Sequence, residues 1–196
     1  MKISVDSTWC RYHYDPLDRL TFCASVAPIN SQRFYLKQHL STEIRGLQQR
    51  SIMQYEDQLL AQHRGQAGTL QTHLLATDQQ RSLLALIDAT RAHLLAYSPY
   101  GHRVPENGLL SLLGFDGERP DPVTGCYLLG NGYRAFNPVL MRFNSPDRLS
   151  PFGKGGVNAY AYCENDPVNH IDPTGKIKRF FIGFGLYKKP HALAAV

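Results

Sequence analysis

The stretch from Gly132 to Gly175 constrains the fold of this chain most, because turn-forming and aromatic residues alternate along it. Gly, Pro, Asn and Asp recur every few residues, which favours tight bends over long helices. The pairs Pro146-Asp147 and Asp172-Pro173 stand at two of these bends. Between the bends lie large aromatic rings, which contribute strongly to protein cores when they are buried: Tyr133, Phe136, Phe143, Phe152, Tyr160 and Tyr162. The pattern predicts short strands and tight turns around buried aromatic rings.

The residues before this stretch also favour strands. Large residues alternate in Thr8–Phe22 on both sides of a turn at 15–18, as in a β-hairpin. Short alternating runs between 32 and 63, separated by glycines, predict a meander. Gln, Leu and Arg also form helices well, so 43–63 and 79–95 stay open to a helical interpretation. The predicted fold class is mainly β, with antiparallel hairpins that end in the turn-rich stretch and with little helix.

The distribution of charge argues against a body that binds nucleic acid. The formal net charge is +5, but residues 176–196 contain five Lys or Arg and no acidic residue. Residues 1–175 therefore hold 16 basic and 16 acidic side chains and are neutral. The basic character belongs to the tail, and nucleic acid is not an expected partner.

Cysteine and histidine residues show no metal-binding pattern. The four cysteines lie far apart without a C-x-x-C pair, and the eight histidines are dispersed. We expect no metal and no cofactor. The sequence contains no run of 18 apolar residues, so no membrane span is predicted. The N-terminus lacks the apolar segment of a signal peptide, so we expect the cysteines to be reduced.

Short motifs along the chain resemble those of Rhs and teneurin-type proteins. Tyr12-His13-Tyr14-Asp15 and Asp18-Arg19-Leu20 resemble a YD repeat, the hairpin unit of their shells, with Asp18 in place of the usual glycine. Further motifs follow in the order of the Rhs repeat-associated core domain: Gly132-Tyr133-Arg134, Asn137-Pro138, Ser145-Pro146-Asp147, Asn165-Asp166-Pro167 and Asp172-Pro173-Thr174-Gly175. The resemblance implies YD-repeat-like hairpins in 1–108, an Rhs core in 109–175 and a truncated variable region in 176–196.

The resemblance also implies a reaction. In that polymorphic-toxin family the core closes a shell of β-strands and cuts the chain after its D-P-x-G motif, which releases a C-terminal toxin. Asp147 and Asp172 match its acidic positions and Arg134 matches a third site, so it implies an intramolecular aspartic-type peptidase that cuts between Gly175 and Lys176. One carboxyl would act as base and the other as acid. Asp beside Pro also caps turns without catalysis, so a non-catalytic module that docks on a larger Rhs-type shell is the alternative.

The tail and the small number of repeats limit the partners. Residues 176–196 are too short for an enzymatic toxin, and they fit a truncated toxin start, a strand packed on the body, or a basic segment that contacts a membrane or a partner. The few YD-like hairpins of this sequence are too few to enclose a cargo. The unpaired edge strands of such a small sheet predict self-association. The implied partners are a larger Rhs or Tc-type shell or a secretion machinery. The implied location is the cytoplasm, before export by a specialised system that needs no signal peptide.

Overall fold

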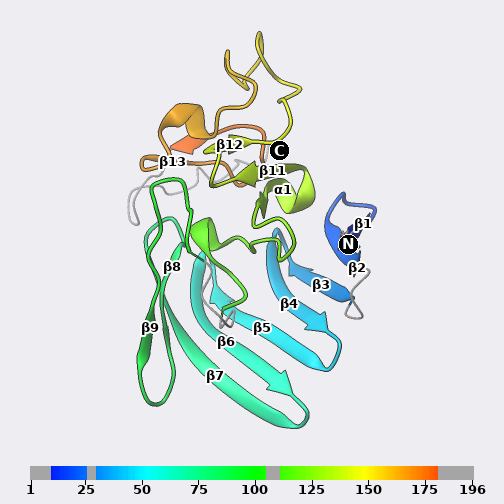
Figure 1. Cartoon of the computed structure of the whole chain (residues 1–196), viewed down its shortest axis with the longest axis vertical. Coiled ribbons are helices and arrows are strands. Elements are labelled where there is room, and N and C mark those ends of the chain that lie inside the picture. The colour runs from blue at the N-terminus through cyan, green and yellow to red at the C-terminus, as the bar shows by residue number, and fades with distance from the viewer. Residues whose placement is uncertain (1–9, 26–29, 105–110, 181–196) are drawn as a thin grey trace, which may run out of the picture.

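The computed structural model describes residues 10–25, 30–104 and 111–180, and within them the fold is mainly β, as predicted. Nine strands of this described part form one antiparallel sheet, in which each strand pairs with the next one along the chain. Figure 1 shows the sheet curving from β1 and β2 on one side to β9 on the other, with the later residues gathered at its upper end. The strands are β1 (Cys10–Tyr14), β2 (Leu20–Ser25), β3 (Ser31–Leu36), β4 (His39–Arg45), β5 (Gln48–Tyr55), β6 (Gln58–Gln66), β7 (Thr69–Thr77), β8 (Leu83–Ile87) and β9 (Ala92–Leu94).

The helical interpretation of 43–63 and of 79–95 is wrong. Strands β4, β5 and β6 cover the first range, and β8 and β9 lie in the second. Lys37, Gly46 and Glu56 begin the turns between β3 and β6, and each has a positive φ that closes a hairpin and interrupts a helix. Pairing with neighbouring strands therefore outweighs the helical propensity of Gln, Leu and Arg.

An apolar cluster holds the segment after residue 110 against the sheet. Its members come from β5, β6, β7, β8 and that segment: Ile52, Leu59, Leu75, Leu83, Leu86, Leu112 and Leu113. Burial of each such side chain contributes about 1.5–3 kcal/mol. Gln62 is fully buried among them, and its Oε1 accepts a hydrogen bond from the backbone N–H of Leu112 at 2.7 Å. The segment is thus fixed by apolar packing and by a buried polar contact.

Residues 115–180, which include the turn-rich stretch, form two small sheets, and the first of them contributes to a second, aromatic cluster. The elements are the 3₁₀ turns η1 (Phe115–Gly117) and η2 (Cys163–Asn165), the short helix α1 (Leu129–Gly132), and the strands β10 (Tyr127–Leu128), β11 (Arg134–Asn137), β12 (Arg142–Phe143), β13 (His170–Ile171) and β14 (Arg179–Phe180). Among the described residues, β10–β12 form one sheet and β13 pairs with β14. The rings of Phe136 and Tyr162 stack with centroids 4.1 Å apart, and Phe143 meets both edge-on.

The prediction of buried rings is confirmed for these three side chains and wrong for two others. Phe136, Phe143 and Tyr162 are at most 1% exposed. Phe152 is 101% exposed and Tyr160 is 42% exposed, because both lie in loops that run outside the cluster. An aromatic residue among turn residues is therefore no proof of burial.

Other expectations meet the structure only in part. Cys126 and Cys163 are free and buried, as expected, but Cys23 is disulfide-bonded, which corrects the expectation of reduced thiols. The predicted domain boundary between 108 and 109, and the tail beyond 180, lie outside the described residues. Within the described part, no helix has the length and apolarity to cross a membrane. The same residues contain no cluster of three His, Cys, Asp or Glu suited to a metal ion.

Candidate functional site

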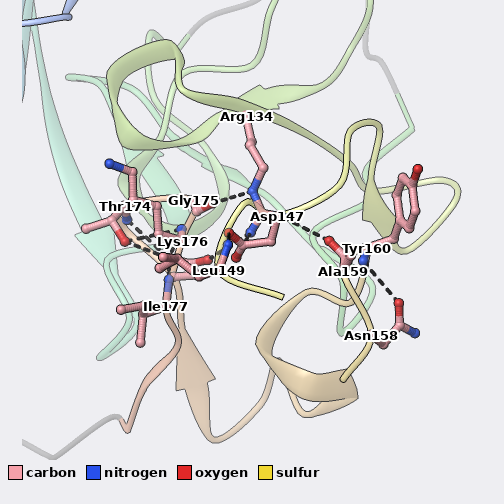
Figure 2. Close-up of polar contacts among 11 residues, drawn as sticks. Arg134, Asp147, Leu149, Asn158, Ala159, Tyr160, Thr174, Gly175, Lys176 and Ile177 are labelled. Atoms are coloured by element: carbon pink, nitrogen blue, oxygen red, sulfur yellow. Dashed lines mark hydrogen bonds and ion pairs between the residues drawn. The ribbon is translucent and has the colours of Figure 1, made fainter. Parts of the chain in front are cut away.

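The structure brings together the three side chains that the sequence singles out. Arg134 opens β11, Asp147 lies in the loop after β12, and Asp172 follows β13. All three are buried, with 4%, 6% and 4% of their surface exposed. Figure 2 shows Arg134 reaching toward Asp147, Ala159 and Gly175. Residues separated by up to 41 positions, from Arg134 to Gly175, thus form one buried polar site.

The guanidinium group of Arg134 is the centre of this site. Its Nη2 donates to Oδ2 of Asp147 at 3.1 Å and lies 3.9 Å from Oδ2 of Asp172. Its Nη1 donates to the carbonyl oxygen of Ala159 at 3.1 Å, and its Nε donates to the carbonyl oxygen of Gly175. The ring of Phe143 stacks under the group at 3.6 Å. One cation therefore contacts two carboxylates and the carbonyl of the predicted cleavage bond.

Burial and charge act in opposite directions on this cation. Burial lowers the pKa of Arg134 from its usual value, whereas the carboxylates of Asp147 and Asp172 raise it. An arginine stays protonated despite such shifts, so the group remains a fixed positive charge. Because water is largely excluded, this charge acts strongly on the atoms that it touches.

The carboxylate of Asp172 holds the chain around the predicted cleavage bond. Its Oδ1 accepts hydrogen bonds from N and Oγ1 of Thr174 at 3.3 and 3.1 Å, from N of Lys176 at 3.1 Å, and from N of Ile177 at 3.2 Å. Gly175 adopts a φ of +65°, a conformation that suits glycine. The turn therefore wraps the bond between Gly175 and Lys176 around one carboxylate oxygen.

A glycine-containing loop covers the carboxylate of Asp147. Its Oδ1 accepts from the backbone N–H of Leu149 at 2.9 Å. A Cβ at Gly155 would lie 2.9 Å from Oδ2 of Asp147, so only a glycine lets the loop come this close. The loop thereby packs closely against the pair formed by Asp147 and Arg134.

Some parts of the site leave little or no signal in the sequence. Ala159 contributes a backbone carbonyl and Thr174 a backbone amide, and only Thr174 adds a side-chain contact, from its Oγ1 to Asp172. Tyr133 contacts the site through its ring, which lies 4.5 Å from Nζ of Lys176. Gly130 has a φ of +63°, and a Cβ there would collide with the carbonyl oxygen of Thr174. Among these, only the Gly130-Asn131-Gly132 run hints at a close backbone approach.

Substitution of Gly130 by alanine tests this close approach. We expect Gly130→Ala to destabilise the protein at least twice as much as Gly125→Ala, because both glycines have positive φ but only Gly130 has a neighbour within 4 Å. The shared cost of the φ angle is about 1 kcal/mol. Urea denaturation of the two variants measures the difference, and equal losses would contradict the contact with Thr174.

A buried acid next to the aromatic cluster makes stability depend on pH. Asp116 accepts a hydrogen bond from the hydroxyl of Tyr162, and its Oδ1 is buried without a partner. Burial raises the pKa of Asp116 to about 8, and the same cause raises the pKa of Glu118 to about 7. Both folded-state pKa values exceed those of the unfolded chain, so stability is greatest below about pH 4 for these groups and falls as pH rises toward 8.

Asparagine at position 116 keeps the acceptor for Tyr162 and removes the titration. The free energy of unfolding of the wild type falls with pH near pH 6, and we expect Asp116→Asn to reduce this slope by up to about 1.4 kcal/mol per pH unit. The part of the slope that comes from Glu118 should remain. Urea denaturation between pH 5 and 8 measures this slope. Asp18→Asn is the matched control, since Asp18 is exposed and also has a positive φ, of 57°. A slope that is the same in both variants would contradict the prediction.

Comparison with known proteins identifies similar families and folds. The sequence profile of the family described as Teneurin YD-shell matches residues 2–168. No curated protein matches the chain. The crystal structure titled TcdB2-TccC3-TEV is similar over 89% of this chain and 9% of its own, with 19% identity and a TM-score of 0.63. A Photorhabdus luminescens Tc holotoxin pore with a substitution in TccC3 matches over 89% of this chain and 11% of its own, with 16% identity and a TM-score of 0.49.

These matches define how far the similarity extends. Part of the TcdB2-TccC3-TEV structure has the fold of this chain, and at 19% sequence identity this similarity shows the fold alone. The chain spans only about a tenth of the length of the structures that it matches.

Proposed function

The chain belongs to the Teneurin YD-shell family, and from this premise we propose that it is an Rhs-type core that closes a β-shell and cuts its own chain between Gly175 and Lys176. One observation carries the proposal: both ends of that peptide bond are contacted by the site. Nε of Arg134 donates to the carbonyl oxygen of Gly175, and Oδ1 of Asp172 lies 3.1 Å from the nitrogen of Lys176.

Each side chain has a role in the proposed hydrolysis. Asp147 takes a proton from a water molecule, whose oxygen attacks the carbonyl carbon of Gly175. Negative charge then develops on the carbonyl oxygen, where Nε of Arg134 stabilises it. The bond from carbon to nitrogen breaks, and the proton that Asp147 took from the water passes to the departing nitrogen of Lys176, which Oδ1 of Asp172 holds in place. The products are a carboxyl group on Gly175 and an amino group on Lys176.

Tethering makes such a reaction efficient without a binding pocket for a separate substrate. The bond is held by the turn of residues 172–177 and by contact with Arg134. Because the reacting groups belong to one chain, no translational freedom is lost when they meet. The proposed reaction therefore occurs once for each molecule.

A purely structural role is the second candidate. Four donors converge on Oδ1 of Asp172, which is also how an aspartate caps a turn. In this case the buried ion pair between Arg134 and Asp147 only stabilises the fold of the core. The chain would then dock on a larger shell as a non-catalytic module.

Mass spectrometry of the purified protein separates the two functions. The peptidase predicts fragments 1–175 and 176–196 in the wild type and an intact chain in Asp147→Asn and Asp172→Asn. Asp166→Asn is a matched control, because Asp166 also precedes a proline but is bonded to Asn169 outside the site. An intact wild-type chain would support the structural module. Cleavage that persists in Asp147→Asn and Asp172→Asn would overturn the assignment of the site.

A further inference from the structure

A row of charged side chains crosses four strands of the large sheet. Arg33 in β3, Glu43 in β4, Arg50 in β5 and Arg64 in β6 are direct partners in the strand register. Residues opposite one another in adjacent strands project from the same face. The row thus places three arginines and one glutamate on one face of the sheet.

The acid in this row is already occupied. Residues 111–122, called the crossing segment, pack against the sheet through Leu112 and Leu113. Nη2 of Arg119 in this segment lies 2.7 Å from Oε1 of Glu43. Nε of Arg33 lies 3.8 Å from the same oxygen. Glu43 is 3% exposed, so both contacts are screened little by water. One carboxylate therefore serves two guanidinium groups, and Arg50 and Arg64 gain no direct partner from it.

A pocket lies beside this row, where the crossing segment meets β4 and β5. Its volume is about 50 Å³, and the charged groups that line it are Glu43, Arg45, Arg50 and Arg119. The remaining lining residues are Gln48, Ser111, Leu112, Pro120 and Pro122. Positive groups outnumber negative ones at this wall by three to one. The space suits a group of a few non-hydrogen atoms.

Some hydrogen-bond donors at this pocket lack acceptors, although Nη1 of Arg119 donates to the carbonyl oxygen of Pro120 at 3.1 Å and its Nη2 contacts Glu43. Within the described residues, the side chains of Arg45 and Arg50 form no hydrogen bond or ion pair with an acid. Nε of Arg119 is buried without an acceptor, on a side chain that is 9% exposed. A buried donor or cation without a partner is costly, and a bound anion removes this cost.

The positive charges around Arg50 also favour an anionic ligand. Burial, together with the charges of Arg64 and Arg45, lowers the pKa of Arg50 from its usual value, and Glu43 opposes this shift. Repulsion among these cations favours any ligand that brings negative charge. Guanidinium groups are planar forks that match the paired oxygens of carboxylates and phosphates.

We propose that the pocket between Arg45, Arg50 and Arg119 is a binding site for one small oxyanion, a carboxylate or phosphate group. This site shares no residue with Arg134, Asp147 and Asp172, and it does not depend on the cleavage reaction. Its three cations come from β4, β5 and the crossing segment, so the ligand would also fasten that segment to the sheet.

Isothermal titration of the full chain with inorganic phosphate and with acetate tests the site, with chloride at matched ionic strength as the reference. We expect saturable binding that weakens at least tenfold in Arg50→Gln and in Arg45→Gln. Arg91→Gln is the matched control, because Arg91 is exposed in the turn between β8 and β9 and should bind as the wild type does. Binding of both anions assigns a general oxyanion site, binding of acetate alone assigns a carboxylate ligand, and binding of phosphate alone assigns a phosphoryl group.

Glu43→Gln tests the site in the opposite direction, because this substitution should strengthen anion binding. Removal of this negative charge from the wall should tighten phosphate binding severalfold, provided that circular dichroism shows the native fold. Arg45 is exposed, so Arg45→Gln carries the test if Arg50→Gln fails to fold. The proposal is overturned if neither anion saturates the wild type, or if Arg45→Gln binds phosphate as tightly as Arg91→Gln does.

Discussion

Replacement of Arg134 by glutamine is expected to slow the proposed cleavage between Gly175 and Lys176 by about 10²–10³-fold, the loss typical for removal of one donor to a developing oxyanion. Glutamine removes the fixed positive charge and the Nε donor to the carbonyl of Gly175. The measurement is the rate at which fragment 1–175 accumulates after synthesis, followed by mass spectrometry.

The same substitution should also reduce stability. Asp147 and Asp172 would keep their buried positions but lose the cation that lies 3.1 and 3.9 Å away. Removal of one member of a buried ion pair costs about 3–5 kcal/mol. Urea denaturation of Arg134→Gln and of the wild type measures this loss.

Arg134→Lys separates the two effects. Lysine restores the charge, so we expect it to recover part of the stability. Lysine cannot reproduce the fork that contacts Asp147, Ala159 and Gly175 together, so cleavage should stay slow. If Arg134→Gln cleaves at the wild-type rate, the catalytic role of Arg134 is wrong and only the structural one remains.

Truncation of the aromatic cluster should have the second large effect. Phe136→Ala is expected to lower the free energy of unfolding by about 3–5 kcal/mol, since a buried ring is lost and a cavity remains. Phe136 is 0% exposed, stacks on Tyr162 at 4.1 Å and meets Phe143 at 5.9 Å. Urea denaturation at a fixed pH measures the change.

Phe152→Ala is the matched control for this prediction. The ring of Phe152 is 101% exposed, and substitutions at such positions usually change stability by less than about 0.5 kcal/mol. Similar losses in both variants would mean that the aromatic cluster does not hold the fold. A large loss in Phe136→Ala alone would confirm it, and cleavage should then slow too, since β11 carries both Phe136 and Arg134.

The sequence was sufficient for the fold class and less so for individual elements. Turn residues and β-branched or aromatic runs are local signals, and they predicted strands and hairpins correctly. Residues 43–63 stayed ambiguous because Gln, Leu and Arg suit either structure, and the decision came from pairing across β4, β5 and β6. Phe136 and Phe152 look alike in the sequence, but only a closed core distinguishes a buried ring from an exposed one.

The candidate site was predictable where side chains carry the chemistry. Arg134, Asp147 and Asp172 were found through short motifs that resemble a known family, and the structure gathers all three. The site also uses the backbone carbonyl of Ala159 and the backbone amide of Lys176, which no side chain marks in the sequence. Only the folded structure shows where these two groups lie. The row of Arg33, Glu43 and Arg50 was equally hidden, because it exists only once the strand register is known.

Pairing between β13 and β14 has a consequence for what would happen after the proposed cleavage. Residues 179–180 pair with 170–171, and Lys178 forms an ion pair with Glu164. These contacts lie beyond the bond from Gly175 to Lys176, so its hydrolysis leaves them intact. The new amino terminus would stay docked as a non-covalent strand, and scission and departure would be separate events. A denaturing gel would then show two pieces where a native column shows one particle.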